Sequence, residues 1–148
     1  MHIISPDTLD RIGKKINLIG MATDSVKAGR SGGNMVALRA AREDLAASEA
    51  DYDKAMGELA PEQRAWVETI FAKPLEMARA GKDGYTQAVY KAQIKWSDDQ
   101  IRELETITTE LKDARTEWVQ DAMSYDVTAY QIAKLCGRTP STVQRWVK

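Results

Sequence analysis

The last 23 residues, 126–148, hold the side chains whose types and spacing are best suited to chemistry. Four basic residues, Lys134, Arg138, Arg145 and Lys148, stand there against Asp126 alone, a local charge of +3 in a chain whose net charge is −1. Gln144 and Arg145 can each make paired hydrogen bonds to a base, the glutamine to adenine and the arginine to guanine. This is the chemistry of holding an anionic polymer and reading its bases.

Two other segments carry the opposite charge. Residues 40–60 sum to −4 and residues 97–125 sum to −5. Such segments repel nucleic acid, so we expect them to face away from it. The anion-binding surface is therefore predicted at the C-terminus.

Short-range signals predict how the C-terminal residues are positioned. Thr128 and Gln131 form a capping box that starts a short helix near Ala129, with Ile132, Ala133 and Cys136 as its inner face. Gly137 supplies a residue that tolerates positive φ, and Thr139 followed by Pro140 caps a second helix. Val143 and Trp146 repeat at a spacing of three and point back at the first helix.

This stretch resembles the helix-turn-helix of bacterial and phage repressors, of the C-terminal domains of serine resolvases and invertases, and of sigma-factor region 4. The family's alanine, turn glycine, valine and final apolar position fall on Ala133, Gly137, Val143 and Trp146. Arg138 departs from the pattern, which usually has an apolar residue after the glycine; a charged residue there either tilts the turn or places a cation near a phosphate. The resemblance covers about the last 35 residues, and the preceding amphipathic helix would complete a three-helix unit.

The resemblance implies that the second short helix enters the major groove of DNA. Base edges would then be met by its outward residues, which are Thr139, Ser141, Gln144, Arg145 and Lys148. Phosphates would be met by Tyr130, Gln131, Lys134 and Thr142, with Arg138 as a further cation near a phosphate. The alternative is a solvated polar face on an ordinary helical hairpin.

The rest of the chain also shows helical patterns. Ser5 and Pro6 start a helix with the apolar stripe Leu9, Ile12, Ile16 and Ile19, which we expect to end at Gly20. Residues 28–34 are predicted to be a loop. A second helix is predicted over 34–59, with its inner positions at Leu38, Ala41, Leu45, Tyr52, Ala55 and Leu59.

Prolines, glycines and a serine mark the expected helix ends and turns of residues 61–100. Pro61 occupies a first helical position, Pro74 predicts a kink or break, and residues 81–84 predict a turn. A short helix over 85–96 is then expected to give way at Ser97, which forms a capping box with Gln100. No alternating strand pattern of useful length is present.

The helix predicted after Ser97 carries an apolar seam of about three heptads: Ile101, Leu104, Ile107, Leu111, Ala114, Trp118, Ala122 and Tyr125. One interpretation packs this seam inside the monomer, against the helix of residues 38–59. The other makes it a dimer interface.

Composition excludes several classes of protein. A hydrophobic fraction of 43% with 29% charged residues is typical of a globular chain. Cys136 is the only cysteine and His2 the only histidine, so we expect neither an internal disulfide nor a zinc site of the usual kind, and we read Cys136 as a buried small hydrophobe. Neither a signal peptide nor a membrane span is indicated, so a cytoplasmic, nucleoid-associated protein is expected.

Enzyme chemistry is not indicated. The glycine-rich residues 29–33 lack the lysine and spacing of a phosphate-binding loop. The N-terminal half shows no nucleophile motif of the kind that a resolvase would need. We therefore expect no catalysis and no cofactor.

These observations predict an all-α protein in two parts. Residues 1–96 would form a helical body that dimerises or binds a protein partner, and residues 97–148 a long helix with the helix-turn-helix. The predicted function is sequence-specific binding of double-stranded DNA by a homodimer, for transcriptional regulation such as repression in a bacterium or phage. The alternatives are docking on a host regulator or polymerase, and an architectural or recombination-accessory role.

Overall fold

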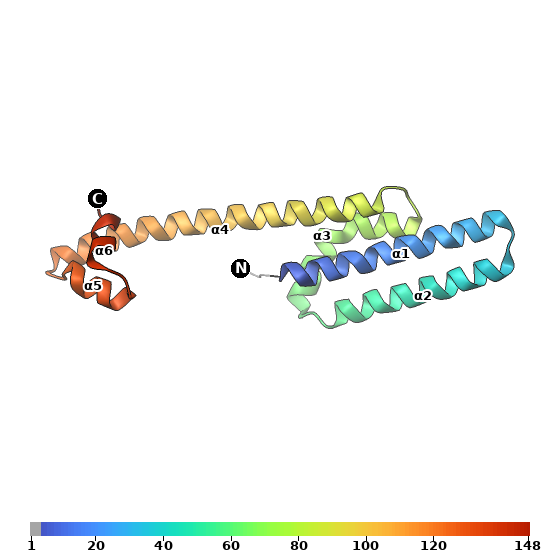
Figure 1. The fold of residues 1–148 in the computed structure, drawn as a ribbon, viewed down its shortest axis with the longest axis horizontal. Helices are drawn as coiled ribbons and strands as arrows, with labels where there is room; N and C mark the ends of the chain where they lie inside the picture. The colour runs from blue at the N-terminus through green and yellow to red at the C-terminus, as the bar shows by residue number, and fades with distance from the viewer. Residues whose placement is uncertain (1–3) are drawn as a thin grey trace. The chain divides into compact units, whose positions relative to one another are not determined.

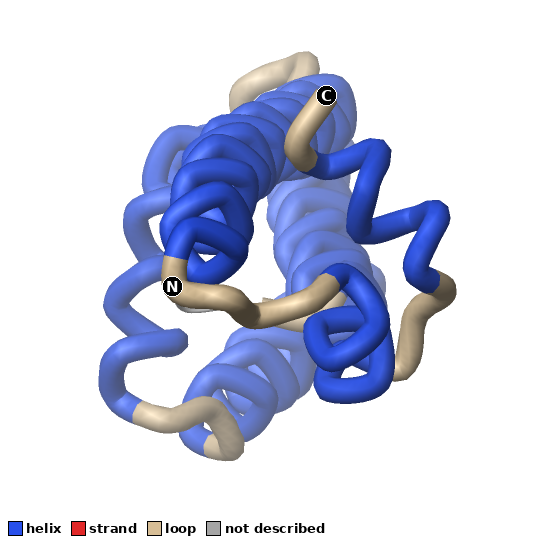
Figure 2. The backbone as a smooth tube through the Cα atoms, turned by 90° about the vertical axis from the view of Figure 1, so that its left-hand side faces the viewer, coloured by secondary structure: helices blue, strands red, loops and turns tan. Residues whose placement is uncertain are grey.

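The computed structural model describes residues 4–148 and shows an all-α fold. Within that range six helices are present and no strand (Figure 1). Short loops connect them (Figure 2). The helices are α1 (Pro6–Gly32), α2 (Met35–Gly57), α3 (Pro61–Ala80), α4 (Tyr85–Ser124), α5 (Ala129–Cys136) and α6 (Pro140–Trp146). His2, the only histidine of the chain, lies outside the described residues.

The chain divides into two compact units. The first ends at Asp98 and holds α1, α2, α3 and the start of α4. The second, Asp99–Lys148, holds the rest of α4 with α5 and α6.

Helix α1 starts as predicted but runs past its predicted end. The Ser5 hydroxyl accepts a hydrogen bond from the Thr8 amide at 3.1 Å, and Pro6 occupies the first turn. The helix then continues through Gly20 to Gly32, so the expected end at Gly20 and the expected loop over 28–34 are wrong. The turn is only Gly33, at φ 64°, followed by Asn34, whose side chain caps α2.

Gly20 has a packing role that explains why the helix does not end there. A Cβ atom at Gly20 would lie 2.3 Å from the Tyr85 ring at the start of α4. The Tyr85 hydroxyl donates to the Asp24 carboxylate at 3.1 Å, and burial together with this hydrogen bond raises the pKa of Tyr85. A glycine in this helix lets an aromatic ring pack against the backbone.

Three contacts set α1 antiparallel to the start of α4. Gln93 lies at hydrogen-bond distance from Asp10, Tyr85 reaches Asp24, and the Lys27 ammonium donates to the Gly81 carbonyl at 2.7 Å. The core of the first unit contains all the predicted stripe residues of α1, which are buried. Its members include Leu9, Ile12, Ile16, Ile19, Val67, Phe71 and Val89.

Helices α2 and α3 also pair antiparallel. Arg79 donates two hydrogen bonds to Glu49, at 3.0 and 2.9 Å. Arg64 donates to the carbonyls of Met56 and Leu59 at the α2–α3 turn. Helix α3 is continuous through Pro74, which is buried, so the predicted break does not occur.

The predicted capping box at Ser97 is absent. Tyr85–Ser124 is one helix of 40 residues, and the Ser97 hydroxyl donates back to the Ile94 carbonyl at 2.8 Å. A serine inside a helix can satisfy its hydroxyl in this way without ending the helix. The separate helix expected over 85–96 is therefore the first part of α4.

The close approach at Gly20 gives a direct test of the first unit. We expect Gly20→Ala to lower the free energy of unfolding by about 1–3 kcal/mol, because the new methyl overlaps the Tyr85 ring. Gly32→Ala is the matched control, since a Cβ there meets no atom within 4 Å. Urea denaturation followed by circular dichroism measures both. Equal stability of the two variants would contradict the packing described.

Candidate nucleic-acid interface

A small core holds the second unit together. It consists of Val119 from α4, Ile132 and Ala133 from α5, and Val143 from α6, all buried. Partly buried residues surround it: Ala122, Met123, Val127, Ala129, Trp146 and Val147. The predicted inner positions Ile132, Ala133 and Val143 thus meet in one cluster, with Trp146 at its edge.

The turn from α4 into α5 is built from local hydrogen bonds. Asp126 takes a left-handed conformation at φ 68°, and the Val127 amide bonds back to the Ala122 carbonyl at 3.1 Å. Helix α5 then opens on the predicted capping box. The Thr128 hydroxyl accepts from the Gln131 amide, and the Gln131 side chain accepts from the Thr128 amide at 2.9 Å.

The α5–α6 turn follows the sequence prediction closely. Gly137 is left-handed at φ 64°, and the Arg138 amide bonds to the Ala133 carbonyl at 2.8 Å. This pattern satisfies the last carbonyls of α5 and redirects the chain. Thr139 then caps α6, with Pro140 in its first turn.

Two residues that sequence reasoning missed tie α6 to α4. The Thr116 hydroxyl donates to the Trp146 carbonyl at 2.8 Å, and the Arg115 guanidinium lies 4.0 Å from the centre of the Trp146 ring. A cation over an indole face is an attractive contact. The partners lie 30 and 31 positions apart, so no local spacing could have revealed them.

The start of α6 presents linked polar side chains to solvent. The Thr139 hydroxyl lies 3.1 Å from the Ser141 hydroxyl and 2.9 Å from that of Thr142. Arg145 donates to the Thr142 hydroxyl at 3.1 Å. Thr139, Ser141, Thr142 and Arg145 therefore form one polar group, which we call the α6 polar cluster. Its hydroxyls can donate or accept, and its guanidinium can bind an anion or a base edge.

The other predicted contact residues do not join this cluster. Gln131 caps α5 with its side-chain oxygen. The remaining five are exposed side chains at separate positions: Tyr130, Lys134, Arg138, Gln144 and Lys148. Lys134, Arg138 and Lys148 can donate hydrogen bonds to a phosphate or a base as cations. Gln144 can donate through its amide, and Tyr130 through its hydroxyl.

The placement of Cys136 corrects one sequence expectation. Cys136 is exposed and does not belong to the inner face of α5. It is the last residue of that helix, where Gly137 turns the chain away from the core. Leu135 beside it is 87% exposed.

The apolar seam of α4 presents large side chains that nothing in the second unit covers. Ile101, Leu104, Leu111 and Trp118 are exposed. Only Ile107, Ala114 and Ala122 of the seam are partly covered.

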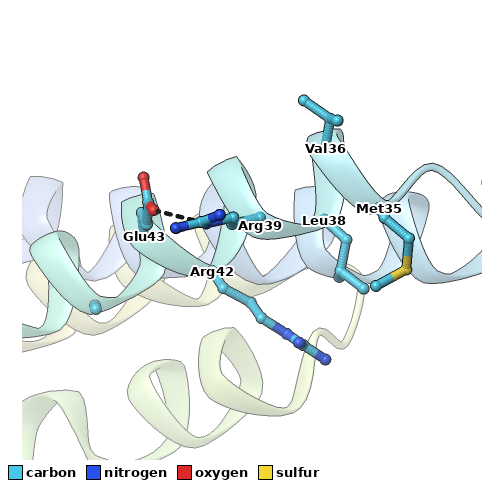
Figure 3. A pocket seen from close by; sticks show the side chains of 7 residues that line it. Met35, Val36, Leu38, Arg39, Arg42 and Glu43 are labelled. Carbon is cyan, nitrogen blue, oxygen red and sulfur yellow. Dashed lines mark ion pairs between the residues drawn. The ribbon is translucent and has the colours of Figure 1, made fainter.

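A hollow of the first unit lies at the start of α2 (Figure 3). Its lining combines apolar and charged side chains: Met35, Val36, Leu38, Arg39, Arg42, Glu43 and Ala46. Arg39 and Glu43 form an exposed ion pair at 3.6 Å. These groups do not bring a nucleophile together with a base.

The structure describes residues 4–148. Within them, no group of three or more histidine, cysteine, aspartate or glutamate side chains could hold a metal ion. None of the helices formed by residues 4–148 is both long and apolar enough to cross a membrane. The chain matches no protein-family model, and comparison with curated proteins and with solved structures finds no significant match.

The left-handed turn at Gly137 supplies a second test. We expect Gly137→Ala to destabilise the second unit by about 1 kcal/mol through backbone strain alone, because a Cβ there meets no atom within 4 Å. Gly33→Ala is the matched control in the first unit, with the same φ of 64° and the same open surroundings. Hydrogen exchange should then quicken in α5 and α6 for Gly137→Ala only. Unchanged exchange in both helices would show that the turn does not hold them.

Proposed function

We propose that this protein binds double-stranded DNA sequence-specifically through α5 and α6, as a homodimer that regulates transcription. The observation that carries the proposal is the α6 polar cluster on a short helix fixed from behind by Val143, Thr116 and Arg115. A reading element needs polar side chains on a rigid, exposed helix.

The charge of residues 126–148, +3, supports an anionic partner at α5 and α6. All four cations of residues 126–148 are exposed, and two of them, Lys134 and Arg138, flank the α5–α6 turn. We propose that Lys134, Arg138 and Tyr130 contact phosphates while Arg145, Gln144 and Ser141 meet base edges. Two copies are required because one such unit offers few base contacts.

One observation favours a second candidate. Leu135 and Tyr130 are both exposed on α5, at 87% and 68%, and exposed aliphatic and aromatic side chains suit a protein surface better than a phosphate backbone. The alternative proposal is that α5 docks on a regulator or polymerase. The first unit, with the exposed Met35 and Val36 of its hollow, is then a further surface for a protein partner.

Selection from a random duplex library tests the proposal. The full-length protein is immobilised, and bound duplexes are recovered and sequenced over successive rounds at about 0.1 M salt. We expect one enriched motif with two related half-sites, since specific binding exceeds non-specific binding by about a thousandfold or more. Retention of all duplexes alike supports an architectural binder. Failure to retain any duplex at low salt contradicts DNA binding and leaves the docking alternative.

Arg42→Ala is the control protein for that selection. Arg42 is an exposed arginine near the start of α2. It belongs to the first unit, whereas α5 and α6 belong to the second. We expect this variant to select the same motif as the wild type. A changed motif would assign base reading to the first unit.

A further inference from the structure

Helix α4 presents an uncovered apolar face within the second unit. Ile101, Leu104 and Leu111 are 54%, 43% and 61% exposed, and Trp118 continues the row one heptad beyond Leu111. Residues spaced by three, four and seven share one side of a helix. A shallow groove follows this side, lined by Ile101, Leu104, Glu105, Thr108, Thr109 and Lys112.

The two charges in this groove have a self-complementary placement. Glu105 and Lys112 stand seven residues apart on the same edge of the groove. Within residues 4–148 neither side chain takes part in an ion pair. A surface with an acid at one end and a base at the other matches a second copy of itself when that copy is reversed.

We propose that α4 pairs antiparallel with α4 of a second copy of this chain along this groove. The two-fold axis passes close to Thr109, perpendicular to the helix. Glu105 then meets Lys112 of the partner subunit, and the symmetric pair forms on the other side of the axis. In the same register, Ile101 lies opposite Trp118 of the partner subunit, and Thr108 opposite Leu111 of the partner subunit.

Charge decides against the parallel arrangement. A parallel pair would also stack isoleucine on isoleucine and leucine on leucine, as two-stranded coiled coils do. It would, however, bring Arg115 beside Arg115 of the partner subunit, and it would leave Glu105 and Lys112 without opposite charges. In the antiparallel pair Arg115 lies opposite Leu104 of the partner subunit and keeps its guanidinium over Trp146.

The antiparallel register has a consequence for DNA, which rests on the proposed function. The α4 residues that hold α5 and α6, Val119, Ala122 and Met123, lie about 12 residues from the two-fold axis. At 1.5 Å per residue, the two attachment points lie about 35 Å apart along α4. Half-sites one turn apart on B-DNA are separated by about 34–36 Å. Two copies can therefore present α6 to successive major grooves.

Charge reversal tests the pairing without DNA. Light scattering of the wild type at micromolar concentration is expected to give the dimer mass. Glu105→Lys and Lys112→Glu each replace two attractions by two repulsions, so each should weaken dimerisation about tenfold at low salt. The double variant, with both changes, should recover the wild-type value. An equimolar mixture of the two single variants should form mixed dimers, since every pair is then of opposite charge.

Cross-linking adds an orientation measurement in a Cys136→Ser background. Ile101→Cys alone should give no disulfide dimer, because its two copies lie far apart in the antiparallel pair. Mixed with Trp118→Cys, it should give a mixed disulfide. Circular dichroism verifies that each variant keeps its helices; these positions are exposed, so we expect no loss of fold.

Three results would overturn the antiparallel pair. They are a monomeric wild type, single charge reversals that leave dimerisation unchanged, and a disulfide formed by Ile101→Cys alone. These outcomes are separable from failure of the proposed function. A protein that obeys the charge-reversal pattern but retains no duplex DNA keeps the α4 pair and loses the DNA proposal.

Discussion

Ala133→Leu is expected to abolish tight DNA binding while the first unit stays folded. Ala133 is 2% exposed, in a cluster with Val119, Ile132 and Val143 where α5 meets α6. Three extra carbon atoms at this position overpack the contact, at a cost of about 1–3 kcal/mol. The strain is relieved when α6 moves away from α5, which misplaces the α6 polar cluster. We expect DNA affinity to fall roughly 10- to 100-fold.

Cys136→Leu is the matched control for this substitution. It adds an aliphatic side chain to the same helix at an exposed position, so it should leave the packing of α6 unchanged. Fluorescence anisotropy of a labelled duplex measures affinity, and hydrogen exchange locates any loss of structure. An Ala133→Leu protein with wild-type affinity and exchange would mean that the α5–α6 contact does not position the binding surface.

Arg145→Ala is expected to cost about 1–3 kcal/mol per half-site and to relax preference at one base position. Arg145 lies in the α6 polar cluster, held by Thr142 at 3.1 Å, and can leave that hydroxyl for a guanine edge. Losing the paired hydrogen bonds to one base lowers the affinity for the selected duplex more than the affinity for duplexes that already lack that base. The measurement is an affinity series on the selected duplex and its single-base substitutions.

Lys134→Ala provides the contrasting result. Lys134 is exposed in the last turn of α5 and is assigned to phosphate. Its loss should weaken all sequences about equally and reduce the salt slope by roughly one unit. If Arg145→Ala instead lowers affinity by the same factor on every duplex, Arg145 is a phosphate contact. Base reading then passes to Gln144 or Ser141.

The short-range features of the fold were predictable from the sequence. Caps at Ser5, Thr128 and Thr139 and the left-handed Gly137 depend on residues within three or four positions, and all four form as predicted. Each satisfies backbone groups at a helix end, which is a local requirement. The all-α class follows from the same signals, and the structure confirms it.

The two predicted helix boundaries at Gly20 and Ser97 were wrong because each residue type is compatible with two local structures. Gly20 can end a helix or admit a neighbouring side chain, and Tyr85, 65 positions later, determines the second outcome. Ser97 can cap a helix or bond backwards within one. Packing of the Tyr85 ring selects the second alternative at Gly20, whereas Ser97 is exposed and its hydroxyl bonds within α4 itself.

The candidate site was predictable as a set of residues but not as an arrangement. Sequence spacing named Thr139, Ser141, Thr142 and Arg145 but not the hydrogen bonds that join them. The stack of Arg115 on Trp146 depends on where α4 and α6 meet, and the exposure of Cys136 depends on its place at the end of α5. Such contacts require the three-dimensional fold.

The claim that α5 and α6 bind DNA is tested most directly by hydrogen exchange with and without duplex. The full-length protein is saturated with the selected duplex, and peptide-level exchange is compared with that of the free protein. We predict slower exchange over residues 129–148, with unchanged exchange in α2 and α3. Protection confined to the first unit, or no protection at all under saturating DNA, would contradict the assignment of DNA binding to α5 and α6.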